Sequence, residues 1–141
     1  MDALPEYVCA VIEDAHGRLL LQLRPADARL APDQLTCFGG RREPGEDVGT
    51  CLRRELTEEL AWAPETTRPC CDLWQGERLI ARFLASHWDG HPLRTEPGHS
   101  ALWLPWPALP GLPISPWHAT VLAAVHGGSS LVRLPTGDAR S

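Results

Sequence analysis

The stretch from Asp47 to Leu60 constrains the fold more than any other part of the chain. Val48, Leu52 and Leu56 recur at every fourth position and continue to Leu60, so they form one apolar stripe along a helix. Acidic residues precede this stripe, where they suit the positive end of the helix dipole, and a proline follows it. A helix with such a stripe has to pack against another layer of structure.

Short apolar runs rich in strand-forming residues lie on both sides of this helix. Tyr7–Glu13 and Arg18–Leu23 flank a turn that contains Gly17, and together they predict a β-hairpin. Strands before and after a central helix indicate a mixed sheet with helices packed on it. The other expected elements are strands at Leu35–Phe38 (ending at Gly39-Gly40), Leu79–Trp88 and Leu102–Leu104, and a second helix at Trp117–Val125.

Length and charge limit the classes of function. The 141 residues predict a single domain over residues 1–127, followed by a loose tail over residues 128–141 in which Leu131 to Leu134 could add an edge strand. The formal charge of −5 argues against a general binder of nucleic acids or membrane surfaces. All 13 basic residues are arginine, which excludes lysine Schiff-base chemistry and a P-loop lysine. Arginine or metal ions would therefore have to meet any phosphate.

The cysteines and the first residues bear on the compartment. The five cysteines form no C-x-x-C pair, and Cys70 and Cys71 are adjacent, which suits neither a disulfide framework nor a zinc site. The first residues lack a basic region followed by a long apolar stretch, and no run approaches the length of a membrane span. We therefore expect a reduced, cytoplasmic protein without a signal peptide.

The helix carries a group of glutamates on one face. Glu55, Glu58 and Glu59 are spaced i, i+3 and i+4, so their side chains lie together beside the apolar stripe. Like charges about 5 Å apart repel by roughly 1–3 kcal/mol per pair at effective dielectric constants of about 20–80. A hard divalent cation would relieve this repulsion, because carboxylate oxygens are the ligands that Mg²⁺ prefers. By itself, however, an E-x-x-E-E pattern is more often a solvated helix face.

The residues upstream turn this pattern into a specific motif. Gly40 is followed after five residues by Glu46, and after seven more by the run Arg54 to Trp62, RELTEELAW. This spacing resembles the Nudix box, G-x5-E-x7-R-E-U-x-E-E-x-G-U, where U is apolar. Every fixed position matches except the last glycine, where the chain has Ala61. If Ala61 takes the left-handed conformation of that glycine, it costs roughly 1 kcal/mol.

The resemblance implies a fold, a reaction and a set of roles. It implies a Nudix-type α/β/α sandwich with a central mixed β-sheet, in which water attacks a phosphorus of a nucleoside diphosphate linked to another group. Mg²⁺ or Mn²⁺ is the implied cofactor. The implied general base is Glu58 or a glutamate outside the motif. The implied roles are metal binding for Glu55, Glu58, Glu59 and the carbonyl of Gly39, orientation of a glutamate for Arg54, and support of the loop and helix start for Glu46.

Other candidates lie outside the motif. Glu96 follows the long strand at the distance at which many relatives bring another glutamate to the metal, although a solvated loop carboxylate is the alternative. His118 stands near the place where relatives that destroy oxidised guanine nucleotides often have an asparagine, and it equally fits a solvent-facing position. Trp117 could stack on a base or belong to the core. Arg24, Arg41 and Arg42 flank the expected phosphate path, and any one of them could bind phosphate.

The expected reaction is cleavage of a nucleoside triphosphate, including an oxidised one, to a nucleoside monophosphate and pyrophosphate. The alternative is a Nudix pyrophosphatase for ADP-ribose, a dinucleotide or a nucleotide sugar. A non-catalytic nucleotide-binding domain is less favoured, because every glutamate of the motif is present. The expected partner is a small nucleotide, without stable nucleic-acid or membrane binding, and the protein is expected to be a monomer or a homodimer.

Overall fold

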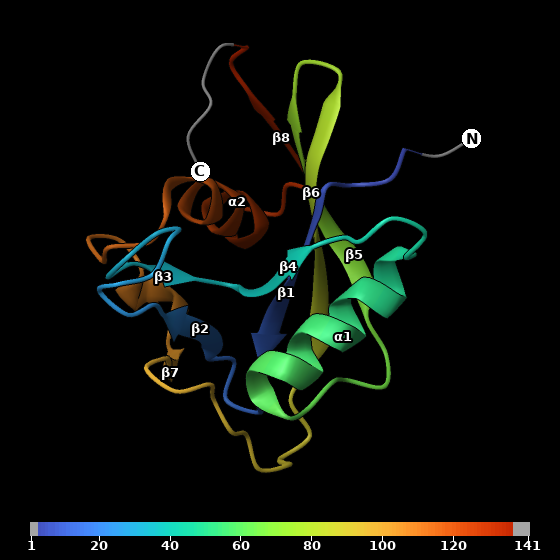
Figure 1. Ribbon diagram of the computed structural model, residues 1–141. Coiled ribbons are helices and arrows are strands. Elements are labelled where there is room, and N and C mark those ends of the chain that lie inside the picture. The colour runs from blue at the N-terminus through green and yellow to red at the C-terminus, as the bar shows by residue number, and fades with distance from the viewer. Residues whose placement is uncertain (1–2, 137–141) are drawn as a thin grey trace.

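A computed structural model describes residues 3–136 of the chain. Two α-helices, α1 (Val48–Leu60) and α2 (Pro116–His126), and a short 3-10 helix, η1 (Trp106–Ala108), accompany the strands of these residues (Figure 1). The strands are β1 (Tyr7–Glu13), β2 (Leu19–Leu23), β3 (Leu35–Thr36), β4 (Phe38–Arg41), β5 (Arg68–Gln75), β6 (Arg78–His87), β7 (Ser100–Leu104) and β8 (Leu131–Leu134).

The strands of the described residues form one mixed sheet around β1. The main path through the sheet is β3-β2-β1-β6-β5-β8, while β4 pairs with β1 and β7 pairs with β2. β1 runs parallel to β6 and antiparallel to β4, with Cys9 opposite Gly39 in the latter pair. The predicted hairpin of β1 and β2 is confirmed, and it closes at the pair Glu13 and Leu19.

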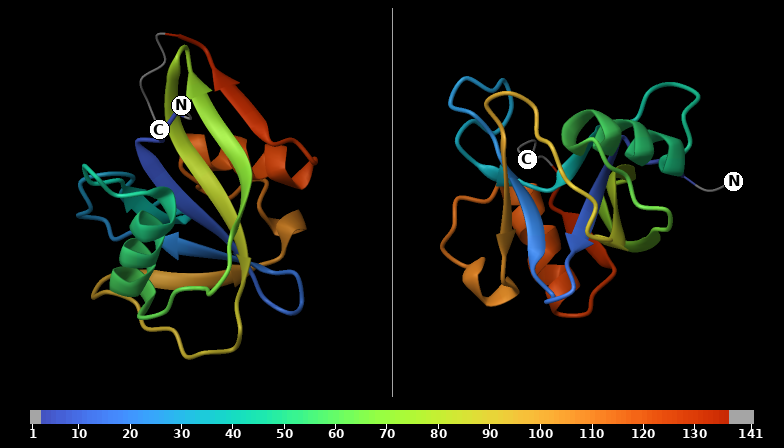
Figure 2. Two further views of the ribbon diagram at one scale, coloured as in Figure 1. Left: turned by 90° about the vertical axis from the view of Figure 1, so that its right-hand side faces the viewer. Right: turned by 90° about the horizontal axis from the view of Figure 1, so that it is seen from below.

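The two α-helices cover opposite faces of this sheet (Figure 2). Successive side chains of a strand point to opposite faces, so β1 contributes to two cores. Its Val8, Ala10 and Ile12 pack in the cluster that contains the leucines of α1. Its Cys9 and Val11 pack in the cluster that contains Val121 and Leu122 of α2. The α/β/α sandwich with a central mixed sheet, expected from the sequence, is therefore confirmed.

The helix that carries the glutamates begins and ends close to the predicted residues. Asp47 caps its N-terminus, and the Asp47 carboxylate accepts a hydrogen bond from the Thr50 amide at 2.7 Å. Ala61 takes the left-handed conformation, with φ of 56°, and its amide donates to the carbonyl of Thr57. The chain thus keeps the glycine-type helix end of the motif and places an alanine in it, at a cost of about 1 kcal/mol.

The far side of the sheet contains one strand that the sequence did not predict and one that it allowed for. β5 was not predicted, because Pro69 and the adjacent cysteines interrupt its alternation, and a register shift between Pro69 and Cys71 accommodates them. The segment from residue 128 was expected to be a loose tail in which Leu131 to Leu134 could add an edge strand, and β8 is that strand: it pairs in parallel with β5, with Val132 opposite Leu73. Residues 137–141 of that expected tail lie outside the described residues. Within the described residues, no helix is long and apolar enough to cross a membrane.

Candidate active site

The glutamate face of α1 packs against the two glycines of β4. The Gly39 amide donates to Glu59 Oε1 at 2.9 Å, which ties the helix to the central strands. A side chain on Gly40 would place its Cβ 2.4 Å from the carboxyl carbon of Glu55. A Cβ on Gly39 would lie 2.2 Å from the carbonyl oxygen of Val8. Gly40 therefore leaves room for the Glu55 carboxylate beside the strand, and Gly39 allows the close approach of β4 to β1.

Arg54 holds the start of the motif together. Its Nε and Nη2 donate to the two carboxylate oxygens of Glu46 at 2.6 and 3.0 Å, a bidentate pair. Its Nη1 donates to Glu55 Oε1 at 2.9 Å and lies 3.8 Å from Glu58 Oε1. The Arg54 guanidinium keeps the pKa of Glu46 low, at about 2. Arg54 and Glu46 thus orient Glu55 and stay ionised around neutral pH.

The remaining carboxylates lie in an environment that disfavours their negative charge. Burial, together with the charges of Glu55 and Glu96, raises the pKa of Glu59 to about 8 against the opposing effect of the Gly39 amide. Burial also raises the pKa of Glu55, although Arg54 opposes this effect. Glu59 is only 9% exposed, whereas the Glu58 side chain is 57% exposed. Buried carboxylates of like charge call for a cation.

The residues present fit a hard divalent cation in the nature of their donors. Glu55, Glu58 and Glu59 supply carboxylate oxygens, and Gly39 brings backbone beside them. Among residues 3–136, no group of three or more His, Cys, Asp or Glu side chains is already placed to hold a metal ion. Arg54 forms an ion pair with the carboxylate of Glu55, and it also lies 3.8 Å from that of Glu58. The three glutamates therefore lie on one face of α1 without surrounding a common point.

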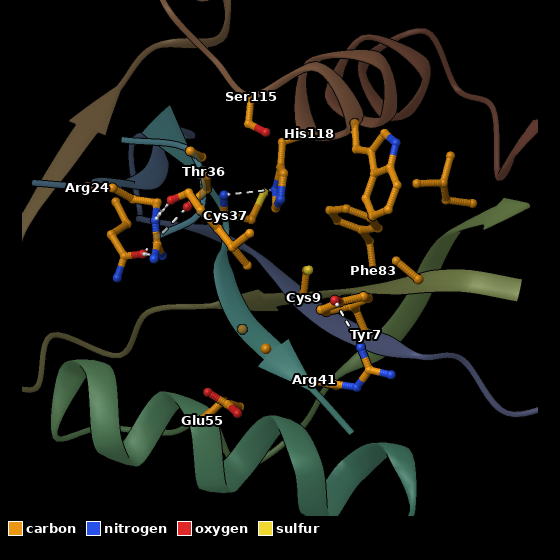
Figure 3. Close-up of a pocket in the computed structure, with 18 residues that line it drawn as sticks. Tyr7, Cys9, Arg24, Thr36, Cys37, Arg41, Glu55, Phe83, Ser115 and His118 are labelled. Atoms are coloured by element: carbon orange, nitrogen blue, oxygen red, sulfur yellow. Dashed lines mark hydrogen bonds between the residues drawn. The ribbon is translucent and has the colours of Figure 1, made fainter. Parts of the chain in front are cut away.

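A cavity of about 560 Å³ runs from this glutamate face towards α2 (Figure 3). Glu55, Gly39 and Gly40 line it at the glutamate face, and His118 and Ser115 line it near the start of α2. Apolar and aromatic side chains cover much of the wall between them. These are Tyr7, Leu73, Ala81, Phe83 and Trp117.

His118 and Trp117, both predicted substrate-binding residues, belong to this cavity. The Cys37 amide donates to His118 Nδ1 at 3.1 Å, and the ring meets Phe83 edge-on at 5.7 Å between centroids. Burial and the charge of Arg24 lower the pKa of His118 to about 4. The ring of Trp117 packs edge-on against Tyr7, and its Nε1 is buried without a hydrogen-bond partner among the described residues.

The predicted arginines differ in their positions. Arg24 lines the cavity and donates from Nε to the Leu30 carbonyl at 2.7 Å. Arg42 instead donates to the carbonyls of Pro5 and Glu46 and does not line the cavity. Arg42 was predicted as a phosphate contact from its place in the sequence, and this role stays a prediction. Its neighbour Arg41, predicted in the same way, lines the cavity.

Other predicted and unpredicted residues complete the site. Glu96 is exposed on its loop, yet its charge acts on Glu59, so it lies within electrostatic range of the glutamate face. Sequence reasoning missed Gln22 and Ser115, which are buried and line the cavity. Gln22 carried a signal, because it is the one polar residue in the apolar run LLLQL of β2. Ser115 carried none, since serine before a helix usually acts as a cap.

The family follows from this site and from direct comparison. A family model described as NUDIX domain matches residues 3–125. The chain therefore belongs to the Nudix family, as the motif predicted.

Particular relatives agree with this assignment. The chain is similar to the NAD-capped RNA hydrolase NudC of Chromobacterium violaceum, with 31% identity over 101 residues, or 70% of this chain and 37% of NudC. It is also similar to the nucleoside triphosphatase NudI of an Enterobacter species, with 40% identity over 60 residues, or 43% of this chain and 42% of NudI. The matched regions thus span less than half of each relative.

A solved structure shows the same fold. The MutT protein of Methanosarcina mazei Go1 superimposes with a TM-score of 0.73 at 15% identity, over 90% of this chain and 97% of that one. At this identity the likeness concerns the fold.

Proposed function

We propose that the protein hydrolyses a nucleoside triphosphate to a nucleoside monophosphate and pyrophosphate. The observation that carries this proposal is the continuity of the cavity, which Glu55 lines at the glutamate face and His118 and Trp117 line near α2. A nucleotide has the same division, with charged phosphates at one end and a flat base at the other. The similarity to a nucleoside triphosphatase favours a triphosphate.

The chain's own residues have distinct roles in this reaction. Glu55, Glu58 and Glu59, with the Gly39 carbonyl, would hold Mg²⁺ or Mn²⁺, and Glu96 would join them from its loop. Such a cation would supply neutralisation of phosphate charge and a lower pKa of the attacking water. Glu58 or Glu96 accepts the water's proton, since both side chains are exposed. Arg54 and Glu46 are positioning residues that act through Glu55.

Arg24 and Arg41 are suited to bind the phosphates, because both line the cavity and arginine pairs readily with phosphate oxygens. Trp117, Tyr7 and Phe83 provide the apolar surface for the base. We further propose a cytoplasmic, monomeric or homodimeric protein that binds neither nucleic acid nor membranes. All five cysteines are free thiols, which supports a reducing compartment.

One observation favours a second candidate, a pyrophosphatase for dinucleotides. The similarity to an NAD-capped RNA hydrolase extends over 70% of this chain. Such a substrate carries a second nucleoside in place of the terminal phosphates.

A product assay separates the two candidates. The purified protein is incubated with Mg²⁺ or Mn²⁺ and, in turn, each nucleoside triphosphate, oxidised guanosine triphosphate, ADP-ribose, NAD and a dinucleotide polyphosphate. We expect pyrophosphate and a monophosphate from at least one triphosphate, with kcat/KM at least tenfold above that of every other class. Preferential cleavage of NAD or a dinucleotide would reject the triphosphate proposal in favour of the second candidate.

A further inference from the structure

Two polar side chains in the cavity wall each face a neighbouring group that can only donate a hydrogen bond. This neighbour determines which atom of the side chain is the acceptor and which is the donor. The first is His118, whose Nδ1 faces the amide of Cys37 at 3.1 Å (Figure 3). A backbone amide cannot accept a hydrogen bond, so Nδ1 carries no proton and acts as the acceptor. In a neutral ring the single proton is then on Nε2.

The ring keeps this state around neutral pH. Burial first, and then the positive charge of Arg24, lower the pKa of His118 to about 4. The side chain is therefore uncharged at pH 7, and its Nε2 is a donor. Among the described residues, none accepts a hydrogen bond from this Nε2. The buried polar atoms without a partner do not include it either. It is thus accessible from the cavity that His118 lines.

The second side chain is Gln22 of β2. Arg24 Nη1 donates to Gln22 Oε1 at 3.2 Å, and the hydroxyl of Thr36 lies 3.5 Å from the same oxygen. A guanidinium group has no acceptor, so the amide oxygen must be the atom that faces Arg24. The amide NH₂ group is therefore turned away from Arg24. Within residues 3–136 it has no partner, although Gln22 is only 2% exposed.

The two donors belong to one part of the wall. Gln22 pairs with Thr36 across β2 and β3, and the next residue, Cys37, is the one that binds His118. Gln22, Thr36, Cys37 and His118 all line the same cavity. The hydroxyl of Ser115, which also lines it, can donate or accept. The wall thus presents two fixed donors and no fixed acceptor from these two side chains.

From this arrangement we propose that the site selects bases whose edge presents two adjacent hydrogen-bond acceptors. The proposal rests on the nucleotide hydrolysis proposed above. Guanine offers N7 and O6, and cytosine offers N3 and O2. Adenine and uracil alternate an acceptor with a donor along each edge. Guanine oxidised at C8 carries a proton on N7, so it loses one of the two acceptors and is a poorer substrate than guanine.

Isosteric substrates test the proposal on the unaltered protein. The kcat/KM of GTP is compared with that of 7-deaza-GTP, and that of CTP with that of 3-deaza-CTP, because each analogue replaces one acceptor nitrogen by a C–H group. We expect the preferred base to be guanine or cytosine and its deaza analogue to lose at least tenfold in kcat/KM. Equal values for both pairs, or a preference for ATP, UTP or the oxidised guanine nucleotide, would overturn the proposal.

Variants assign the effect to the two side chains. His118→Phe keeps a ring but removes the donor, and Gln22→Glu replaces the donor by an acceptor oxygen. In each variant, the loss in kcat/KM that the deaza analogue shows should be less than threefold. His126→Phe is the matched control, because His126 is in the same helix but stacks on Trp106 outside this cavity. It should keep the full effect, and a full effect in His118→Phe and Gln22→Glu as well would contradict the assignment.

Failure of the proposed function and failure of the proposed base selection give different results. If the unaltered protein releases pyrophosphate from no triphosphate, the proposed function is wrong. If it cleaves triphosphates without regard to the acceptor nitrogen, only the proposed base selection is wrong. Nitrogen-15 NMR of the imidazole gives a readout apart from activity: we expect a protonated Nε2 and an unprotonated Nδ1 for His118 at pH 7, and the reverse tautomer would reject the donor assignment.

Discussion

Burial acts on single residues of this site in opposite directions. It raises the pKa of Glu59 to about 8 and lowers that of His118 to about 4, because in both cases it disfavours the charged form. The two residues differ in how the unfavourable charged form is avoided. Glu59 lies among other carboxylates and suits a cation, whereas His118 remains a neutral ring with a defined donor.

The pKa of His118 predicts a loss of stability in acid. The folded pKa of about 4 lies below the ordinary value of 6.5, so the unfolded chain binds the proton more readily between these pH values. The stabilisation is complete above pH 6.5 and is lost as the pH falls to about 4, by up to about 3 kcal/mol at 1.4 kcal/mol per pKa unit. Urea unfolding at pH 7 and pH 4.5 measures it.

The variants isolate the contribution of this ring from that of other groups. His118→Phe should lose clearly less stability between the two pH values than the unaltered protein, and His126→Phe should lose as much as the unaltered protein. The same loss in His118→Phe as in the unaltered protein would show that His118 does not cause the acid sensitivity.

At the scale of elements, the contact between β4 and α1 builds the glutamate face. The sequence predicted one strand over Leu35–Phe38 that ends at Gly39-Gly40, but the chain forms β3 and then a separate strand, β4, which contains both glycines. The two positions are sensitive for different reasons. A Cβ on Gly39 would meet backbone atoms of β1, and φ there is 142°, whereas a Cβ on Gly40 would meet the movable end of the Glu55 side chain.

Alanine at these two positions should separate stability from activity. Gly39→Ala should lower the free energy of unfolding by about 2 kcal/mol or more, because the backbone must shift. Gly40→Ala should keep most of its stability, since Glu55 can move aside, but should lose at least tenfold in kcat. Denaturant unfolding and turnover of both variants test this, and a stable, active Gly39→Ala or a fully active Gly40→Ala would contradict it.

For the whole molecule, local sequence patterns predicted most of the fold and the glutamate face of the site. The four-residue stripe predicted α1, and the motif spacing predicted which glutamates share its face. β5 was not predicted because Pro69 and a register shift disturb its alternation. The part of the cavity near α2 was predicted only in part, because it depends on a contact between Cys37 and His118, 81 residues apart, which no local pattern encodes.

Hydrolysis at the glutamate face of α1 requires the carboxylates of Glu58 and Glu59, so their glutamine variants test it. Pyrophosphate release from the preferred triphosphate is followed with Mg²⁺ for the unaltered protein, Glu58→Gln and Glu59→Gln, with Glu65→Gln as an exposed control away from the cavity. We expect turnover to fall at least tenfold in Glu58→Gln and in Glu59→Gln, to stay unchanged in Glu65→Gln and to vanish with a chelator. Near-normal turnover in both Glu58→Gln and Glu59→Gln would contradict the claim.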